Sequence, residues 1–212
     1  ITDAAKELWV LYVSFTAALM VILFFLGMSP LDAICHGFTT LSTGGFSTHT
    51  ESIGYFENPL IHWVIILFMF IGGVNFSLYS QVLRRKFRSV LSNREFRAFA
   101  LIIIGSTLIG VYVVPTTGHF ATDLRDVIFQ VVTLVTSTGF VTVDYDAWPT
   151  VMRTVLVMLM FVGGCMGSTS GGIKIMRVLV FAKTVSRKLH RLLYPHGVRP
   201  VRIGRKVFKP DV

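Results

Sequence analysis

The sequence has few charged residues for its length. Asp, Glu, Lys and Arg make up 15% of the 212 residues, whereas soluble domains carry about 25%. Hydrophobic residues make up 53%, and the mean hydropathy is +0.68. This composition argues against a soluble domain and indicates a membrane protein. We therefore interpret the net charge of +9 as the mark of a cytoplasmic face rather than of a nucleic-acid-binding surface.

Cysteine is scarce, and histidine is scattered. The two cysteines, Cys35 and Cys165, lie in apolar surroundings and form neither a disulfide framework nor a metal-binding pattern. The histidines also lack metal-ligand spacing. They are His36, His49, His62, His119, His190 and His196. The sequence has no initiator methionine and no signal-peptide pattern, so we expect a fragment of a longer protein.

Complete enzyme motifs are missing as well. The segment "GSTSG" resembles a nucleophile elbow, but Thr169 stands where that motif has serine. The longer segment "GSTSGGIK" resembles a phosphate-binding loop. However, Ile173 separates Gly172 from Lys174, and no Ser or Thr follows the lysine. We therefore expect no enzymatic activity and no organic cofactor.

Four long uncharged runs predict membrane-spanning helices, because about twenty apolar residues cross a bilayer. The runs are Leu8–Gly27, Leu60–Leu83, Ala98–Val114 and Thr154–Ile173. Two shorter apolar segments lie between them, Leu31–Leu41 and Leu124–Val135. These are too short to span and predict re-entrant helices. Each begins near an acidic residue, Asp32 or Asp126, which suits a helix N-terminus.

The charges predict the orientation. Basic residues cluster between the second and third runs, at Arg84, Arg85, Lys86, Arg88, Arg94 and Arg97, and eleven more lie from Lys174 to Lys209. The positive-inside rule places both clusters in the cytoplasm, with only Arg125 and Arg153 outside. Acidic residues then face outward, at Asp32, Glu51, Glu57, Asp123, Asp126, Asp144 and Asp146. Such charges draw cations towards an external mouth, although ordinary solvated loops explain any single one equally well.

The sequence also repeats itself. A shift of 94 residues aligns Asp32 with Asp126 and Gly45 with Gly139. After the loops a shift of 91 aligns Gly72–Gly73 with the glycine pair at 163–164. We predict an all-α integral membrane protein with two parallel span–pore helix–span repeats, as in a potassium-channel-like pore. The predicted divisions are 1–93, 94–183 and a basic cytoplasmic tail, 184–212.

Each short segment runs into a loop rich in hydroxyls and glycine. Main-chain carbonyls and hydroxyls are ligands for a dehydrated cation, and glycine permits the backbone geometry that presents them. The loops align with the first four positions of the Thr-Val-Gly-Tyr-Gly filter of potassium channels. The aligned residues are Thr43, Gly44, Gly45 and Phe46, then Ser137, Thr138, Gly139 and Phe140. Ser47 and Val141 replace the second channel glycine, so we expect a less strict filter.

Three segments closely resemble a known family: "FTTLSTGGFSTHTESIGYF", "VTLVTSTGFVTVDYDAWP" and "FVGGCMGSTSGGIKIMRV". They are similar to the TrkH-type potassium-uptake subunit of the bacterial Trk system, in the Trk/Ktr/HKT superfamily. The resemblance implies four repeats around one pore, of which this chain would be the C-terminal half, with the N-terminal repeats missing. It also implies K⁺ bound at the eight loop residues, a homodimer, a cytosolic nucleotide-binding TrkA-type subunit and the bacterial inner membrane. Passive conduction and coupling to H⁺ or Na⁺ both stay open.

Glycine-rich stretches interrupt the span after each loop, "FIGGVNFS" and "FVGGCMGSTSGGIK". Gly163, Gly167 and Gly171 are four residues apart, as in closely packed membrane helices. The alternative is a helix break that acts as a gate, since an unbroken helix from Pro149 to Lys183 would be about 50 Å long against about 30 Å of hydrocarbon. The resemblance places an intramembrane loop near 72–80.

The gate candidates are Gly72, Gly73, Asn75 and Lys174. Two of them have simpler explanations: Asn75 as a helix-packing hydrogen bond and Lys174 as a cation reaching the membrane interface. Two other functions are weighed against potassium uptake. One is a non-selective Na⁺/K⁺ transporter. The other is a membrane-bound scaffold, whose basic tail lies on anionic lipid or docks a cytosolic partner.

Overall fold

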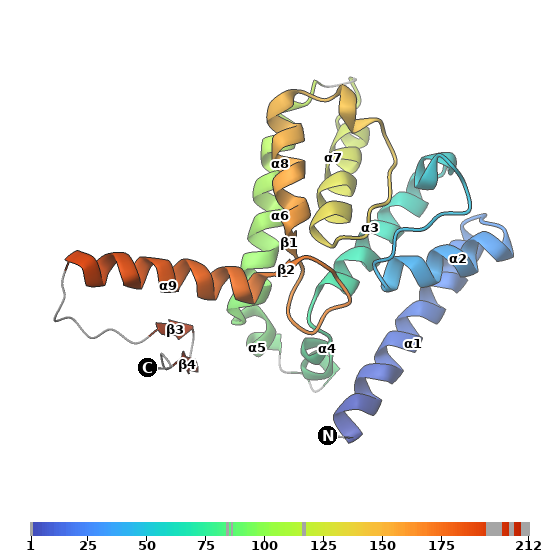
Figure 1. The fold of residues 1–212 in the computed structure, drawn as a ribbon. Helices are drawn as coiled ribbons and strands as arrows, with labels where there is room; N and C mark the ends of the chain where they lie inside the picture. The colour runs from blue at the N-terminus through green and yellow to red at the C-terminus, as the bar shows by residue number, and fades with distance from the viewer. Residues whose placement is uncertain are drawn as a thin grey trace.

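The computed structural model describes residues 2–83, 85, 87–115, 118–193, 201–203 and 206–208. Helices dominate this part of the chain (Figure 1). They are α1 (Thr2–Phe25), α2 (Pro30–Leu41), α3 (Pro59–Gly73), α4 (Phe76–Leu83), α5 (Phe87–Leu91), α6 (Arg94–Val113), α7 (Phe120–Val135), α8 (Thr150–Phe161) and α9 (Ile175–Leu193). Single 3₁₀ turns occur at Ser52–Tyr55 and Tyr145–Ala147. The prediction of a helical protein is confirmed in its coarse form, because this part of the chain is mostly helical.

Two pairs of short strands accompany the helices. The strands are β1 (Val162–Gly163), β2 (Ile173–Lys174), β3 (Val201–Ile203) and β4 (Lys206–Phe208). β1 pairs with β2 in parallel, and β3 pairs with β4 antiparallel. Arg84 and Lys86 of the predicted cytoplasmic cluster, and residues 194–200 of the tail, lie outside the described residues. α9 runs without interruption across the predicted boundary between 183 and 184.

The described helices form two successive units with the same order of elements. Each has a long helix, a short helix that ends in a loop, and a second helix that is interrupted. α1, α2 and α3–α4 form the first unit, and α6, α7 and α8–α9 the second. The short helix packs on the long helix of its own unit, and α3 packs on both α2 and α7. α3 therefore joins the two units (Figure 1).

Side-chain caps explain where several helices begin. Ser29 caps α2 by accepting a hydrogen bond from the backbone of Asp32, and Pro30 follows at the first helical position, where its missing N–H costs nothing. Asn58 caps α3 and Asn93 caps α6 through their side-chain oxygens. Such caps satisfy backbone donors that the helix itself leaves unpaired.

The second short helix begins earlier than predicted. α7 starts at Phe120 rather than at Leu124, and the acidic residue in its first turn is Asp123. The interpretation of Asp126 as the N-terminal acidic residue is therefore wrong. Its carboxylate instead accepts hydrogen bonds from the Arg125 guanidinium, 2.8 Å away.

Two helices of the described part are long and apolar enough to span a membrane, Ala5–Phe25 and Arg94–Val113. The predicted span Leu60–Leu83 is not one helix, because α3 and α4 meet at 99° across a short break. The predicted span Thr154–Ile173 is helical only to Phe161. Both interruptions fall at the glycine-rich stretches, as one of the two sequence interpretations required.

The apolar core lies between α2, α3, α6 and α7. Its largest fully buried side chains include Phe99, Phe129, Phe140, Leu41, Ile65 and Met69. Many large apolar side chains instead face outward from α1, α6 and α8, among them Trp9, Phe25, Leu101, Leu108, Val157 and Phe161. Outward apolar faces of this extent suit a lipid environment rather than water. α9 projects away from the α6–α8 body (Figure 1).

Candidate functional site

The first loop is a tight turn at the C-terminal end of α2. The carbonyl oxygen of Thr39 accepts hydrogen bonds from the backbone N–H groups of Gly44 (2.8 Å) and Gly45 (3.3 Å). Thr43 has a φ of 53° and Gly45 one of 68°. A positive φ is rare for a β-branched residue such as threonine, so the turn holds Thr43 in a strained conformation.

The second loop repeats this turn at the C-terminal end of α7. The carbonyl oxygen of Thr133 accepts from the N–H groups of Thr138 (2.8 Å) and Gly139 (3.2 Å). Ser137 has a φ of 58° and Gly139 one of 88°. Every bond and every positive φ lies 94 residues after its counterpart. The loops therefore share one backbone geometry, although their sequences differ at half of the positions from 43 to 46.

The two loops lie side by side. A Cβ atom at Gly45 would collide with the carbonyl oxygen of Thr138, so the backbones touch there. Farther along, the N–H of Gly54 donates to the carbonyl of Val141 at 3.1 Å, and the N–H of Val141 donates to Ser52 Oγ at 3.2 Å. The structure thus brings together the first quartet, Thr43–Phe46, and the second quartet, Ser137–Phe140.

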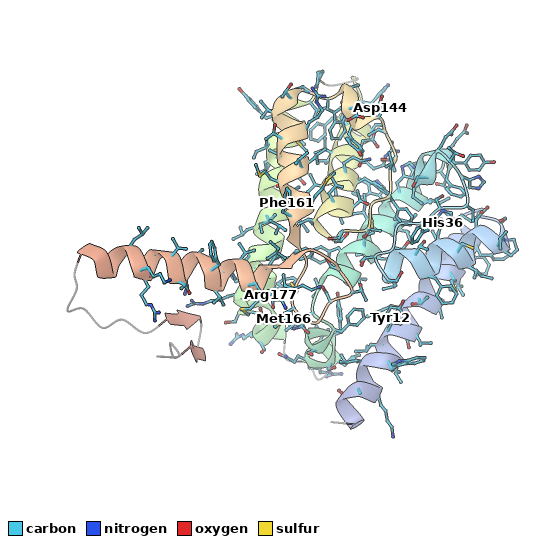
Figure 2. All side chains as sticks on the ribbon, viewed as in Figure 1. Tyr12, His36, Asp144, Phe161, Met166 and Arg177 are labelled. Carbon is cyan, nitrogen blue, oxygen red and sulfur yellow. The ribbon has the colours of Figure 1, made fainter. Side chains whose placement is uncertain are left out.

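Each loop is also tied to its own short helix. His36 Nδ1 lies 2.8 Å from the carbonyl oxygen of Asp32, which only accepts, so Nδ1 carries the proton and Nε2 accepts from Ser47 Oγ at 2.9 Å. In the second unit Gln130 Nε2 donates to Thr142 Oγ1 at 3.4 Å. His36 and Gln130 are again 94 residues apart, and His36 is labelled in Figure 2. The sequence comparison did not single out this pair.

The carboxylate of Asp32 fastens the outer end of the first loop. Thr48 Oγ1 donates to Asp32 Oδ1 at 2.5 Å, Ser29 Oγ donates to Oδ2 at 2.7 Å, and His49 Nε2 lies 3.4 Å from Oδ1. The Thr48 hydroxyl, followed by Ser29 and His49, holds the pKa of Asp32 below its usual value against a partial desolvation. Asp32 is therefore ionised at neutral pH.

The two phenylalanines of the quartets differ sharply in burial. Phe140 is fully buried, and its ring centroid lies 5.9 Å from that of His36 in the other unit. Phe46, at the equivalent position, is 76% exposed. The contact that covers Phe140 therefore has no counterpart around Phe46 within the described residues.

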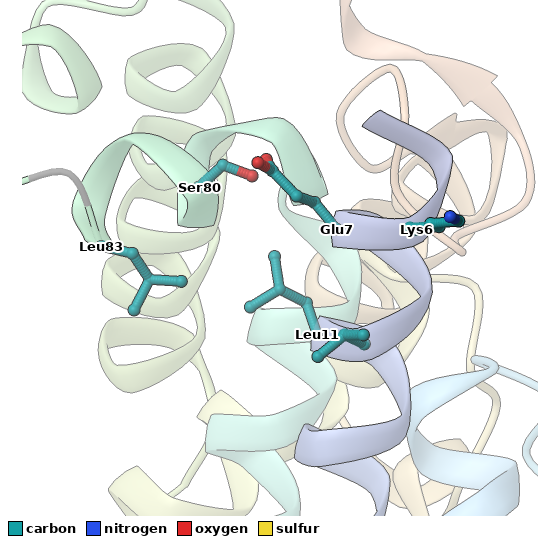
Figure 3. Close-up of a pocket in the computed structure, with 6 residues that line it drawn as sticks. Lys6, Glu7, Leu11, Ser80 and Leu83 are labelled. Atoms are coloured by element: carbon teal, nitrogen blue, oxygen red, sulfur yellow. The ribbon is translucent and has the colours of Figure 1, made fainter. Parts of the chain in front are cut away.

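A polar cavity of about 480 Å³ opens beside the outer flanks of the loops. It is lined by Glu51, Gly54, Val141, Thr142, Val143, Asp144, Tyr145 and Asp146. Three of these residues are acidic, so the cavity carries negative charge. Asp144 is labelled in Figure 2 near the N-terminal end of α7, to which the chain returns after the second quartet. A second cavity, of about 420 Å³, lies between α1 and α4 and is mostly apolar, with Lys6 and Glu7 at its edge (Figure 3).

The two helix interruptions bind each other. We call Val162–Lys174 the gate loop, after the gate predicted from the sequence as one explanation of this interruption. The carbonyl of Gly72 accepts from the N–H (3.2 Å) and the hydroxyl (3.1 Å) of Thr169, and the carbonyl of Gly73 accepts from the N–H of Cys165 at 2.9 Å. The carbonyls that α3 leaves unpaired at its end are thus satisfied by the gate loop. No pattern in the sequence predicted this role for Thr169.

The gate loop is closed at its base by β1 and β2. Within it, the N–H of Gly164 donates to Ser170 Oγ at 2.7 Å. Lys174 Nζ donates to the carbonyl of Ser170 and to Ser168 Oγ. Lys174 thus ties the loop to itself, which the interpretation as a cation reaching the interface does not account for. The helix-packing interpretation of Gly163, Gly167 and Gly171 is wrong, because none of them lies in a helix.

The joined interruptions press against the quartets. A Cβ atom at Gly72 would lie 3.4 Å from Thr43 Cγ2, and one at Gly171 would lie 3.4 Å from Ser137 Cβ. Gly73 is close-packed too, because a Cβ there would be 2.8 Å from Phe99 Cζ. The gate loop and the end of α3 therefore sit directly against the first residue of each quartet.

Asn75 has a structural role beside the gate loop. Its side-chain oxygen accepts from the N–H of Ser77 at 2.8 Å and so caps α4. The next residue, Phe76, donates its N–H to the carbonyl of Gly167 at 3.1 Å. Among the gate candidates, Gly72, Gly73 and Lys174 contact the gate loop or belong to it, and Asn75 lies alongside Gly167.

The site contains hydroxyls without partners. Ser137 Oγ and Thr133 Oγ1 are buried and have no hydrogen-bond partner in the described part of the chain, which is uncommon for buried polar atoms. The same part holds no group of three His, Cys, Asp or Glu side chains suited to a metal ion. Oxygen ligands at the loops would therefore come from carbonyls and hydroxyls.

These features define a helical membrane protein in which two short helices end in paired turns above two interlocked helix breaks. Comparison with known proteins agrees. The family model TrkH, described as cation transport protein, matches residues 1–212. The chain is 37% identical over 212 residues to the "Trk system potassium uptake protein TrkH" of Salmonella typhimurium, covering 97% of this chain and 44% of the relative. The TrkH protein of Escherichia coli K12 gives the same figures.

A solved structure is also similar. The crystal structure of the potassium transporter TrkH from Vibrio parahaemolyticus superposes with a TM-score of 0.89 at 33% identity, covering 96% of this chain and 45% of that one. The chain belongs to the TrkH family of cation transport proteins. It is therefore part of a transporter family rather than an enzyme, and it spans less than half the length of these relatives.

Proposed function

We propose that this chain forms part of a potassium-uptake pore in which main-chain carbonyls of the two quartets coordinate dehydrated K⁺. Hydroxyls such as Ser137 Oγ add oxygen ligands. α2 and α7 direct their negative C-terminal ends towards the loops, which favours a cation there. The relatives quoted above are named potassium uptake proteins, and K⁺ is the transported ion in this proposal.

The observation that carries the proposal is the duplicated turn. One backbone geometry, with the same carbonyl acceptor and the same two positive φ values, is built twice from different residues, and the two copies touch at Gly45 and Thr138. An ordinary surface turn has no reason to be paired in this way. A ring of loops that share one ion path does, because each loop supplies part of the coordination shell.

Burial supports a larger ring made with further units of the parent chain. Phe140 packs against α2 of the preceding unit, whereas Phe46 is exposed. At the opposite side, Gly45 touches the neighbouring loop, while no described atom lies within 4 Å of a Cβ at Gly139. Both differences are expected if further units abut the chain at Phe46 and at Gly139.

The interlocked helix breaks form the gate in this proposal. They lie directly against Thr43 and Ser137, where an ion leaving the quartets must pass. Gly72 and Gly73 offer the carbonyls that hold the gate loop, Lys174 keeps the loop folded and places a positive charge beside the path, and Asn75 fixes α4 below it. Movement of the loop would open or close the pore.

The assembly follows from the same family membership. The relatives belong to a system whose name implies further components, so we include a TrkA-type nucleotide-binding regulatory subunit and a homodimer in the proposal. The bacterial inner membrane is the location, with the basic segment around α5 and the start of α6 on the cytoplasmic side. The acidic cavity beside Asp144 then faces outward and gathers cations.

Radioactive Rb⁺ uptake tests this function. The full-length parent protein is placed in liposomes, and K⁺ and Na⁺ compete for uptake in the wild type, in Gly139→Ser and in the control Gly105→Ser. Gly105 lies in α6 away from the loops. We expect K⁺ to compete better than Na⁺, and Gly139→Ser alone to reduce that difference. Uptake insensitive to K⁺ would refute the proposal, and equal competition by Na⁺ in the wild type would favour a non-selective transporter.

A membrane-bound scaffold is the second candidate, and α9 favours it. The helix projects from the body and exposes Val178, Phe181, Val185 and Leu189 at helical spacing. Basic residues such as Lys183 and Lys188 stand between them in the sequence. This is the pattern of a helix that lies on anionic lipid or docks a partner. It leaves the paired turns unexplained, so it is an additional role at most.

A further inference from the structure

Glu95 is a buried acidic residue that lies outside the quartets and the gate candidates. It stands in the first turn of α6, and only 3% of its surface is exposed. A buried carboxylate is costly unless it is hydrogen-bonded. The groups around the Glu95 carboxylate therefore indicate its role. They lie in the gate loop and at the start of α9 rather than in α6.

The carboxylate of Glu95 is hydrogen-bonded to the gate loop and lies near the start of α9. Glu95 Oε1 accepts a hydrogen bond from the backbone N–H of Met166 at 2.5 Å. The backbone N–H of Met176, in the first turn of α9, and the ammonium group of Lys174 add electrostatic attraction to the same carboxylate. Met166 is labelled beside the junction of α6 and α9 in Figure 2. One side chain thus holds the middle of the gate loop and the start of the helix that follows it.

A hydrogen bond to the Glu95 carboxylate is stronger than one between two neutral groups. Bonds from backbone N–H groups to a carboxylate are charge-assisted, and burial strengthens them. The N–H of Met176 is one of the first-turn groups that α9 cannot pair internally, so the nearby negative charge of Glu95 also favours the start of α9. If the gate loop moved away, the carboxylate would stay buried without the Met166 donor, which opposes the movement.

We propose that Glu95 is the positioning residue that holds the gate loop against the quartets, so that opening requires its release. This inference rests on the proposed function of the gate loop. Asn93 is distinct from it, because Asn93 Oδ1 caps α6 itself through the N–H groups of Glu95 and Phe96. Loss of Asn93 loosens the start of α6 but leaves the carboxylate in place, which makes Asn93 a matched control.

Cys165 reports on release of the loop. It is fully buried, lies next to Met166, and donates its N–H to Gly73. In the full-length parent protein, the rate of its alkylation by N-ethylmaleimide is followed on the Cys165 peptide by mass spectrometry. We expect Glu95→Ala to raise this rate by about tenfold or more, from the loss of charge-assisted bonds. Glu95→Gln keeps an acceptor oxygen and gives a smaller rise, and Asn93→Ala gives none.

The outcomes are separable. The inference is overturned if Cys165 is alkylated at the wild-type rate in folded Glu95→Ala. It is also overturned if Cys165 is alkylated as fast in Asn93→Ala as in Glu95→Ala. If Glu95→Ala does not fold, Glu95→Gln decides, and no rise in that variant overturns it as well. Rb⁺ uptake without any regulatory subunit is measured in parallel and is expected to rise in Glu95→Ala. Faster labelling with unchanged uptake supports the holding role of Glu95 while contradicting the gate in the proposed function.

Discussion

The carbonyl oxygens of Thr39 and Thr133 each accept two hydrogen bonds, from the residues five and six positions later. This shared arrangement folds the chain back at the end of α2 and of α7 and gives both loops the same turn. Because donors and acceptor are backbone atoms, the same hydrogen bonds form in both loops although two of the four quartet residues differ. The quartets therefore differ in sequence while they keep one shape, as the proposed coordination of one ion by repeated loops requires.

Substitution of Gly45 should damage the packing between the loops. A Cβ there collides with the carbonyl of Thr138, and the φ of 68° disfavours other residues. We expect Gly45→Ala to lower the stability of the parent protein by about 3 kcal/mol, from overpacking and backbone strain. Gly105→Ala, in α6 with open space around it, should be neutral or stabilising. Thermal unfolding in detergent measures both, and a neutral Gly45→Ala would contradict the contact.

His36 should contribute to the stability of the first loop through its hydrogen bonds. His36→Leu leaves the carbonyl of Asp32 and the hydroxyl of Ser47 without this partner, and we expect it to cost about 1–3 kcal/mol. His36→Gln imitates Gln130 of the second unit and should recover part of the loss. Thermal unfolding of both variants in detergent is the measurement. Equal unfolding of the wild type and His36→Leu would show that the loop does not depend on this side chain.

Asp32 should make the outer end of the first loop sensitive to acid only at low pH. Its pKa is lowered, mainly by the Thr48 hydroxyl, so its stabilising effect is complete above the ordinary pKa, about 3.9. The effect is lost as the pH falls through the lower pKa of the folded protein. Thermal unfolding from about pH 6 to pH 3 should show this loss in the wild type. Asp32→Asn should lack that component, and an identical pH profile would contradict the assignment.

Substitution of Phe46 tests whether a further unit of the full-length protein covers the first loop. Phe140→Ala removes a fully buried ring and should destabilise the parent protein by about 3–5 kcal/mol. If another unit covers Phe46 as α2 covers Phe140, Phe46→Ala should cost a similar amount in the full-length protein. Comparison of the two variants by thermal unfolding decides this. A neutral Phe46→Ala would show that its ring is exposed in the complete protein as well.

Much of this architecture is predictable from local sequence. Apolar run lengths predict the long helices, the Thr/Gly loops mark the ends of α2 and α7, and the excess length from Pro149 to Lys183 predicts an interruption. The glycine spacing alone left both helix packing and a break open, and the two interpretations could hold together. The structure decides for the break because Gly164 bonds to Ser170 and the glycines of the gate loop let backbones approach closely.

Long-range partners were not predictable in the same way. Glu95 looks like an ordinary acidic residue in the first turn of a helix, yet its carboxylate bonds to Met166, 71 positions away. Thr169 stands where a nucleophile elbow would have serine, yet its N–H and hydroxyl donate hydrogen bonds to the carbonyl of Gly72. Neither partnership follows a fixed sequence spacing. Glu95 and Met166 meet within the second unit when α6 packs beside the gate loop, and Thr169 and Gly72 meet where the two units pack together. The repeat shift of 94 residues was the one signal that could have paired His36 with Gln130.

The central claim is that both quartets coordinate the transported ion through main-chain oxygens. Anomalous X-ray scattering from crystals of the full-length protein grown with Rb⁺ tests it most directly. The account predicts Rb⁺ on a common axis, within coordination distance of carbonyl oxygens from both Gly44–Gly45 and Thr138–Gly139. Rb⁺ bound elsewhere in the path, or quartet carbonyls that all point into neighbouring helices with no ion beside them, would contradict it.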